Sequence, residues 1–208
     1  MLRKAIDLDP KNATHHSYLG NALRNQQKLP EAIAAYRKAI EIDPRHVGAH
    51  QSLALALATA PDPKVRDPRL AVEHAKKAVE LEPQPAISLQ VLGWVQYCAG
   101  AWRESIEALE KSCKLQSGGT GDGGQWIVLA LAHAKLAAQE GLPEKEREHH
   151  KSEARRQYEQ ADKQIDTWWR ARPGNFGGQV IWNFRAEARE LMKKEPGLRN
   201  QESEKKSK

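Results

Sequence analysis

The 208-residue sequence predicts an all-α fold assembled from repeated helices. A short phrase recurs along the chain: RKAIDLDP at residues 3–10 returns as RKAIEIDP at residues 37–44, so the two prolines are 34 residues apart. Weaker copies, KKAVELEP and EKSCKLQS, occupy residues 76–83 and 110–117. A fixed period of this length is typical of repeat proteins, in which helical units stack on their neighbours. The hydrophobic residues are rich in alanine, with only 2 Phe and 4 Tyr, which suits closely packed helices better than a sheet sandwich.

The first full repeat shows an order of small and large residues that explains how its two helices pack. Gly20 and Ala32 allow two antiparallel helices to approach closely, Tyr36 fills the gap, and Pro44 ends the second helix. This order resembles the tetratricopeptide (TPR) repeat, although His16 stands where the family has its first aromatic residue. The matching positions are Leu19, Gly20, Leu23, Ala32, Tyr36, Ala39 and Pro44. The resemblance implies a right-handed TPR α-solenoid of antiparallel helix pairs.

Two later repeats depart from the standard length. The second carries extra residues in its turn, around residues 58–68, which are too rich in proline to be helical. In the fourth, the second helix is expected only from residue 153, after a charged insertion around residues 141–151. The expected segments are a half-repeat (1–12), repeat 1 (13–46), repeat 2 with its inserted loop (47–85), repeat 3 (86–122), repeat 4 with its insertion (123–172), a capping helix (179–192) and a disordered charged tail (193–208).

The two ends of the predicted solenoid differ. Residues 179–192 are amphipathic, as expected for a capping helix that covers the last apolar face. Residues 1–8 correspond to the second helix of a repeat whose first helix is missing, which leaves an apolar edge uncovered. Either the natural protein continues N-terminally, or this edge contacts a partner.

The composition argues against a membrane span and against nucleic acid as a partner. No apolar run approaches the ~18 residues that a span needs, and the N-terminus lacks the apolar core of a signal peptide. The formal net charge is +6, but residues 193–208 supply +3 of it with six Lys/Arg and three Glu. The other charges are interspersed, as on solvated helix faces. Cys98 and Cys113 are predicted to be free thiols, which favours a reducing, cytoplasmic location.

Several longer phrases resemble the TPR tails of planctomycete-type bacterial proteins. They lie at residues 66–79, 92–102, 105–112 and 182–191. In that group such tails often follow a serine/threonine protein kinase domain or a WD40 array, so the resemblance implies a context and no reaction. The kinase motifs V-A-I-K, H-R-D and D-F-G do not occur in the sequence. The expected function is a non-catalytic protein-binding scaffold, and the alternative is a regulatory or substrate-recruiting region of a larger bacterial kinase.

The family resemblance also implies where a protein or peptide partner would bind. TPR solenoids usually hold an extended peptide or a helix in the concave groove lined by the first helix of each repeat. Trp94 would be an aromatic anchor there, unless it packs against the chain's own C-terminal helix. The groove positions carried over are Ser17, Asn21, Arg24, Gln51, Leu55, Gln90, Trp94, Tyr97, Ile127, Leu131 and Lys135.

One function known in the family is excluded by the residue types. TPR co-chaperones capture the C-terminal carboxylate of heat-shock chaperones with a clamp of Lys, Asn and Arg side chains. Only Asn21 matches that clamp, because the other positions hold Ser17, Ser52, Ile87 and Val91, none of them cationic. A clamp without positive charge attracts a carboxylate poorly.

Two apparent cofactor or metal motifs have plainer interpretations. Gly119, Gly121 and Gly124 form a literal G-x-G-x-x-G, but the dinucleotide motif follows a β-strand, and here a predicted helix precedes it. The run is interpreted as a pliable joint between repeats 3 and 4, with an anion at the Gln125 end as a minor alternative. His46 and His50 have i, i+4 spacing, but no Cys or carboxylate completes a metal set. We expect no cofactor, no metal and no catalytic residue.

Overall fold

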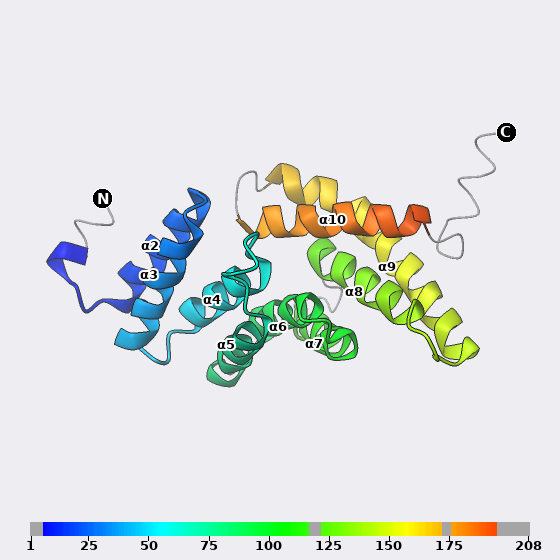
Figure 1. Cartoon of the computed structure of the whole chain (residues 1–208), viewed down its shortest axis with the longest axis horizontal. Coiled ribbons are helices and arrows are strands. Elements are labelled where there is room, and N and C mark those ends of the chain that lie inside the picture. Colours follow the sequence, from blue (N-terminus) through cyan, green and yellow to red (C-terminus); the bar gives the residue numbers. More distant parts are fainter. Residues whose placement is uncertain (1–5, 117–121, 172–175, 195–208) are drawn as a thin grey trace. The chain divides into compact units, whose positions relative to one another are not determined.

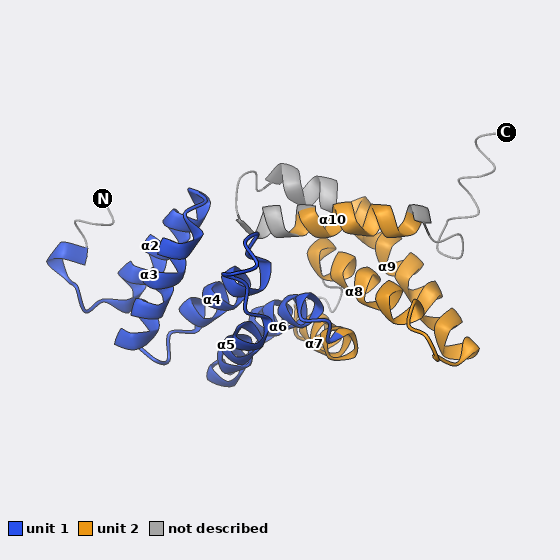
Figure 2. Ribbon diagram, viewed as in Figure 1, with its two compact units in different colours: residues 1–101 blue, residues 102–208 orange. Residues whose placement is uncertain are grey.

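The computed structural model describes residues 6–116, 122–171 and 176–194, with side chains described in these ranges except at residues 165–180, 182, 193 and 194. Within these ranges all regular secondary structure is α-helical. The chain separates into two compact units, residues 1–101 and 102–208 (Figure 2). The boundary falls inside the expected third repeat, so the two helices of that repeat belong to different units.

Unit 1 is a series of helical hairpins. Its described helices are α2 (Ala13–Asn25), α3 (Leu29–Ile42), α4 (Val47–Thr59), α5 (Pro68–Leu81) and α6 (Ala86–Cys98). α2 packs on α3 and α4 packs on α5, while α3 also contacts α4 and α5 contacts α6 (Figure 1). The first helices of neighbouring pairs meet as well, because α4 contacts both α2 and α6.

Local sequence signals set where these helices begin. The side chain of Asn12 caps α2 by accepting hydrogen bonds from the backbone N–H groups of residues 14 and 15, at 3.1 and 3.3 Å. Asp67 caps α5 in the same way, and Pro68, which needs no N–H partner, is the first residue of that helix. Between α4 and α5, Arg66 donates two hydrogen bonds to the carbonyl of Ala60, at 2.9 and 2.8 Å, and so fixes the connecting loop.

Close packing of α2 on α3 depends on one glycine. Tyr36 of α3 is fully buried, and a Cβ placed on Gly20 of α2 would lie only 2.6 Å from Cδ1 of its ring. The Tyr36 hydroxyl donates a 2.8 Å hydrogen bond to Oδ1 of Asn21. The absence of a side chain at residue 20 therefore lets the Tyr36 ring approach α2 closely, and the Tyr36 hydroxyl still has a hydrogen-bond partner.

Unit 2 is arranged around one central helix. Its described helices are α7 (Trp102–Leu115), α8 (Gly123–Ala137), α9 (Glu144–Ala171) and α10 (Phe176–Lys194). α8 contacts α7, α9 and α10, and nearly all of its residues are buried (Figure 1). A helix that is apolar on all sides, as α8 is, belongs inside a helical assembly.

The charged segment of the fourth repeat differs from the prediction. Residues 144–151 were expected to be an insertion before the second helix, but they form the first two turns of α9, which runs for 28 residues. Ion pairs contribute to the helix in this polar segment: Glu148 pairs with Lys151 at 2.7 Å, and Glu146 pairs with Arg103 of α7 at 2.6 Å. The segment also packs on α8 through the buried His150. The connection between α8 and α9 is therefore limited to residues 138–143.

The last described helix, α10, packs on α8 and contacts α9. A Cβ on Gly124 would lie 2.8 Å from Cδ1 of Ile181, and Lys135 pairs with Glu187 at 3.0 Å, so α10 runs parallel to α8. Arg185 of α10, which is buried, pairs with Asp162 of α9 at 2.8 Å. α10 thus contacts both helices of the preceding pair, as the first helix of a further repeat would.

Candidate functional site

The predicted groove positions of unit 1 lie on α2, α4 and α6, three helices that contact one another in order. Asn21 of α2 links three helices. Its Oδ1 accepts hydrogen bonds from the Tyr36 hydroxyl and, at 3.3 Å, from Ser52 of α4. Its amide nitrogen donates to no group of the described chain. Asn21 therefore joins α2, α3 and α4 and keeps a donor for an external acceptor.

A second polar link connects α4 with α6. Gln51 donates from Nε2 to the hydroxyl of Ser88 at 2.8 Å, and Ser88 donates in turn to Glu82 at 2.6 Å. Oε1 of Gln51 accepts no hydrogen bond within the described chain. Leu55, one turn further along α4, is partly exposed and supplies an apolar contact. This surface therefore offers a donor, an acceptor and an apolar side chain on adjacent helices.

Arg24 is the cationic member of this surface. Its guanidinium lies 6.0 Å from the centroid of the Tyr36 ring. Partial burial lowers the pKa of Arg24 from its ordinary value, and the negative charge of an ionised Tyr36 would act in the opposite direction. An arginine remains charged at neutral pH under such conditions, so the groove keeps a positive charge at the end of α2.

Several other predicted groove residues are buried in the structure. Ser17, Gln90, Trp94 and Tyr97 are between 4% and 9% exposed. Trp94 in particular is 7% exposed, so it is part of a packed interior and not an open aromatic anchor. Arg24, Gln51, Leu55 and Asn21 are the members of unit 1 that keep accessible surface.

The predicted groove positions of unit 2 are covered by the chain itself. Ile127 and Leu131 are 0% and 1% exposed on the central helix α8. Lys135 is paired with Glu187 of α10. Because α7, α9 and α10 all contact α8, these three positions take part in core packing and in one ion pair.

The start of α8 shows how the glycine-rich run ends. Gly119 and Gly121 lie outside the described residues. The Asp122 side chain caps α8 by accepting from the backbone N–H of Gln125 at 2.9 Å, and the Gln125 side chain accepts from the backbone N–H of residue 122 at 2.7 Å. A carboxylate thus occupies the place where an anion would bind, which argues against the minor anion-site alternative.

Two histidine pairs, each at least partly buried, were missed by sequence reasoning. Nδ1 of His50 on α4 lies 3.0 Å from Nδ1 of His74 on α5, and Nδ1 of His133 on α8 lies 2.8 Å from Nδ1 of His150 on α9. Burial lowers the pKa of each of these four imidazoles, and for His133 the pKa falls to about 4. Each pair has one histidine on each helix of a hairpin, a pairing that helix spacing alone does not reveal.

His46 and His50, which have the i, i+4 spacing of metal ligands, each have another structural role. Nδ1 of His46 accepts from the backbone N–H of Ala49 at 3.1 Å and so caps α4. His50 is engaged by His74 and, through Nε2, by the carbonyl of Pro44 at 3.1 Å. Among the described residues no group of three or more His, Cys, Asp or Glu is placed to hold a metal ion.

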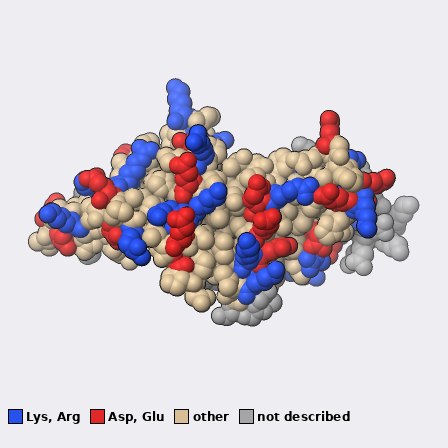
Figure 3. Space-filling model, turned by 90° about the horizontal axis from the view of Figure 1, so that it is seen from below, with Lys and Arg blue, Asp and Glu red and all other residues tan. Residues whose placement is uncertain are grey.

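The charge distribution and the helix composition also bear on the kind of partner. Acidic and basic side chains are intermixed over the face shown in Figure 3, as predicted from the interspersed charges. None of the described helices combines the length and the apolar character needed to cross a bilayer.

Comparison with known proteins identifies TPR repeats at the start of the chain. A TPR repeat model matches residues 20–59, and a second tetratricopeptide repeat model matches residues 1–34. No curated protein matches the chain. The two models together cover residues 1–59, where the sequence follows the family pattern best.

Solved structures extend the similarity over most of the chain. A thermophilic TPR protein of Thermus thermophilus is 16% identical, with a TM-score of 0.61 over 92% of this chain and 87% of that one. The MamA protein is 20% identical, with a TM-score of 0.56 over 89% and 90%. YrrB, described as a TPR protein with an unusual peptide-binding site, is 18% identical, with a TM-score of 0.56 over 93% and 89%. The fold class is therefore an all-α TPR solenoid, as predicted.

Proposed function

We propose that this chain is a non-catalytic scaffold that binds an extended peptide or a helix of a partner protein on the α2–α4–α6 surface of unit 1. The observation that carries the proposal is the pair of unused polar atoms, Nδ2 of Asn21 and Oε1 of Gln51. A peptide backbone presents one acceptor and one donor per residue, which such a pair matches. Leu55 and Arg24 beside them add an apolar and a cationic contact.

The relatives support a binding role. YrrB is described as having a peptide-binding site, and it has the same fold over most of its length. Peptide recognition by helical repeats needs only a rigid surface of adjacent helices. The hydrogen bonds that link α2 to α4 and α4 to α6 supply that rigidity here.

The reactive side chains of the described chain support a non-catalytic role. Burial raises the pKa of the Cys113 thiol to about 11, which keeps it protonated and a poor nucleophile at neutral pH. Among the described residues, none of the hydrogen bonds of the four paired histidines joins a hydroxyl or a thiol. Both cysteines are free, which accords with the cytoplasmic location that we propose.

Two secondary proposals remain from the sequence. The N-terminal end carries an exposed Leu8, 87% accessible, and Tyr18, 56% accessible, which supports a partner contact at that end. The planctomycete-type context and the kinase-regulatory alternative rest on the family resemblance, and no contact among the described residues favours them over the scaffold.

The proposal is tested by capturing a partner with the wild-type chain, identifying it by mass spectrometry, and measuring its affinity in purified form by calorimetry. Leu55→Asp should weaken that affinity by at least about tenfold, because it places a charge on an apolar contact. Leu115→Asp is the matched control, since Leu115 is 47% exposed on α7 in unit 2. Equal affinity of both variants would refute the assignment of the surface.

Trp94→Ala is unsuitable for this test. Because Trp94 is buried, its truncation is expected to cost about 3–5 kcal/mol of stability. A loss of binding in that variant would report unfolding as readily as a lost contact.

A further inference from the structure

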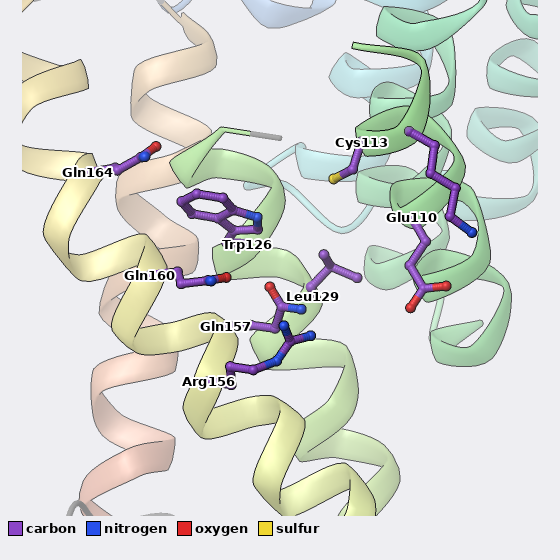
Figure 4. Close-up of a pocket in the computed structure, with 9 residues that line it drawn as sticks. Glu110, Cys113, Trp126, Leu129, Arg156, Gln157, Gln160 and Gln164 are labelled. Atoms are coloured by element: carbon purple, nitrogen blue, oxygen red, sulfur yellow. The ribbon is translucent and has the colours of Figure 1, made fainter. Parts of the chain in front are cut away.

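Unit 2 contains a pocket on the side of α8 that faces away from α10. Its volume is about 610 Å³, and residues of α7, α8 and α9 line it (Figure 4). Trp126 of α8 contributes to the lining, and it lies nine residues before Lys135, or about 180° around the helix at 3.6 residues per turn. Since Lys135 pairs with α10, the pocket and the capping helix occupy opposite sides of α8.

The floor of the pocket is apolar and uncharged. Leu129 is 2% exposed, and the Trp126 indole is partly exposed beside it (Figure 4). Cys113 of α7 completes the floor, and because burial raises the pKa of its thiol to about 11, the sulfur carries no charge at neutral pH. This floor suits an apolar side chain.

One wall is a row of primary amides on α9. Gln157, Gln160 and Gln164 follow one another along the same face of that helix (Figure 4). Gln157 is 8% exposed, and its buried Oε1 has no hydrogen-bond partner among the described residues. A buried acceptor without a partner is energetically unfavourable, and a ligand that donates to it removes that cost. The Gln160 and Gln164 amides likewise form no hydrogen bond within the described chain. The wall therefore suits a ligand that both donates and accepts.

The charges at the rim do not select an ionic ligand. Arg156 is paired with Glu153 at 2.5 Å. Glu110 and Lys114, on the opposite wall, have opposite signs. The neutral amide row is consequently the main polar feature of the pocket.

The spacing of the amides fits a peptide backbone. Gln157 and Gln164 are seven residues apart, which is about 10.5 Å along the helix axis at 1.5 Å per residue. Three residues of an extended chain span about 10 Å at 3.3 Å per residue. We propose that this pocket binds an extended peptide segment of a partner protein, with its backbone bonded to the glutamine row and one apolar side chain on Leu129 and Trp126. This is a second binding site, in unit 2, independent of the α2–α4–α6 surface.

The test uses the full chain labelled with ¹⁵N and three acetylated, amidated heptapeptides of Ser and Thr with Leu, Phe or Asp at the centre. The Leu and Phe peptides should produce saturable shifts at pocket residues, including the side-chain amide of Gln157. The Asp peptide should bind at least about tenfold more weakly, because it cannot fill the apolar floor. Since the amide row recognises backbone groups, both apolar peptides are expected to bind.

Two variants test the amide row. Gln157→Met and Gln164→Met keep the side-chain length and remove the amide, and each should raise the Kd by about two- to tenfold. Gln164 is exposed, so the Gln164→Met variant should fold even if replacement of the buried Gln157 disrupts folding. The Gln164→Met variant therefore keeps the test valid. Gln96→Met is the matched control, because Gln96 is also buried with an unpartnered Oε1 but lies on α6 in unit 1.

Four results would overturn the proposal. The first is the absence of saturable shifts at the pocket with either apolar peptide up to about 5 mM, a limit at which even a millimolar complex is visible. The second is equal binding of the Asp peptide. The third is an equal loss of affinity in Gln96→Met. The fourth is a set of shifts confined to α2 and α4, which would assign the peptide to the surface in unit 1.

Discussion

The buried His133–His150 pair predicts that unit 2 loses stability in acid. Burial, followed by the nearby His150, lowers the pKa of His133 from 6.5 to about 4, and Glu153 acts in the opposite direction. Between these two pH values the unfolded chain binds a proton at this residue and the folded chain does not. The contribution of His133 to the stability of unit 2 is therefore fully present above pH 6.5, and it is lost as the pH falls towards 4. The lowered pKa corresponds to a loss of about 3 kcal/mol in the free energy of unfolding, at about 1.4 kcal/mol per pH unit.

His133→Gln removes this titration and keeps a side chain that can both donate and accept a hydrogen bond. Between about pH 7 and about pH 4 the wild type should lose about 3 kcal/mol more stability in unit 2 than the variant does. His149→Gln is the control, because His149 is exposed beside the pair on α9 and is only a minor cause of the lowered pKa.

Hydrogen exchange followed by mass spectrometry measures unit 2 separately from unit 1. Peptides covering residues 123–137 and 144–164 report the opening free energies of α8 and α9, after correction for the intrinsic exchange rate at each pH. If His133→Gln loses as much protection in acid as the wild type, the histidine pair is not the source and the reasoning is refuted.

Three further predictions concern packing and reactivity. Gly20→Ala should destabilise unit 1 by about 1–2 kcal/mol in urea titrations, because the clash with the Tyr36 ring exceeds the gain in helix propensity. Gly124→Leu should raise hydrogen exchange in α10, because the new side chain displaces Ile181 and costs about 1–3 kcal/mol. Cys113 should react with iodoacetamide about 100-fold more slowly in the folded chain than in urea at about pH 7.5, since its thiolate is scarcer by the rise in pKa from 9.0 to about 11.

Each of these has a control within the chain. Gly48→Ala places its Cβ no closer than 3.6 Å to any neighbour and should be neutral or mildly stabilising. Gly124→Leu should leave exchange in α2 and α3 unchanged, and a change there would indicate general unfolding. Alkylation of Cys113 is measured on the peptide that contains it, separately from Cys98. Equal alkylation rates for Cys113 in the folded and unfolded chains would contradict its burial.

The sequence predicted the helix pairs because their determinants are local and periodic. Gly20, Ala32 and Tyr36 are spaced as two helices in contact require, and Pro30 and Pro68 lie at helix starts. The helical state of residues 144–151 was missed because a polar segment without an apolar stripe resembles a loop. Its contacts are with other helices: Glu146 pairs with Arg103 on α7, and His150 contacts His133 on α8.

The candidate sites were less predictable, since accessibility depends on which other segments pack nearby. The repeat pattern placed Asn21 and Leu131 at equivalent groove positions. Asn21 keeps a donor that no group of the described chain uses, whereas Leu131 is buried in unit 2.

The amino-acid sequence by itself determined the class of this fold, the stacked helix pairs and the first repeat, because period, small residues and helix caps act within about 34 residues. Only the tertiary structure decided which surfaces stay open. The contacts of α10 with α8, the two histidine pairs and the pocket between α7 and α9 each join residues on different helices. Such contacts depend on the relative placement of whole helices, which a one-dimensional repeat pattern does not specify.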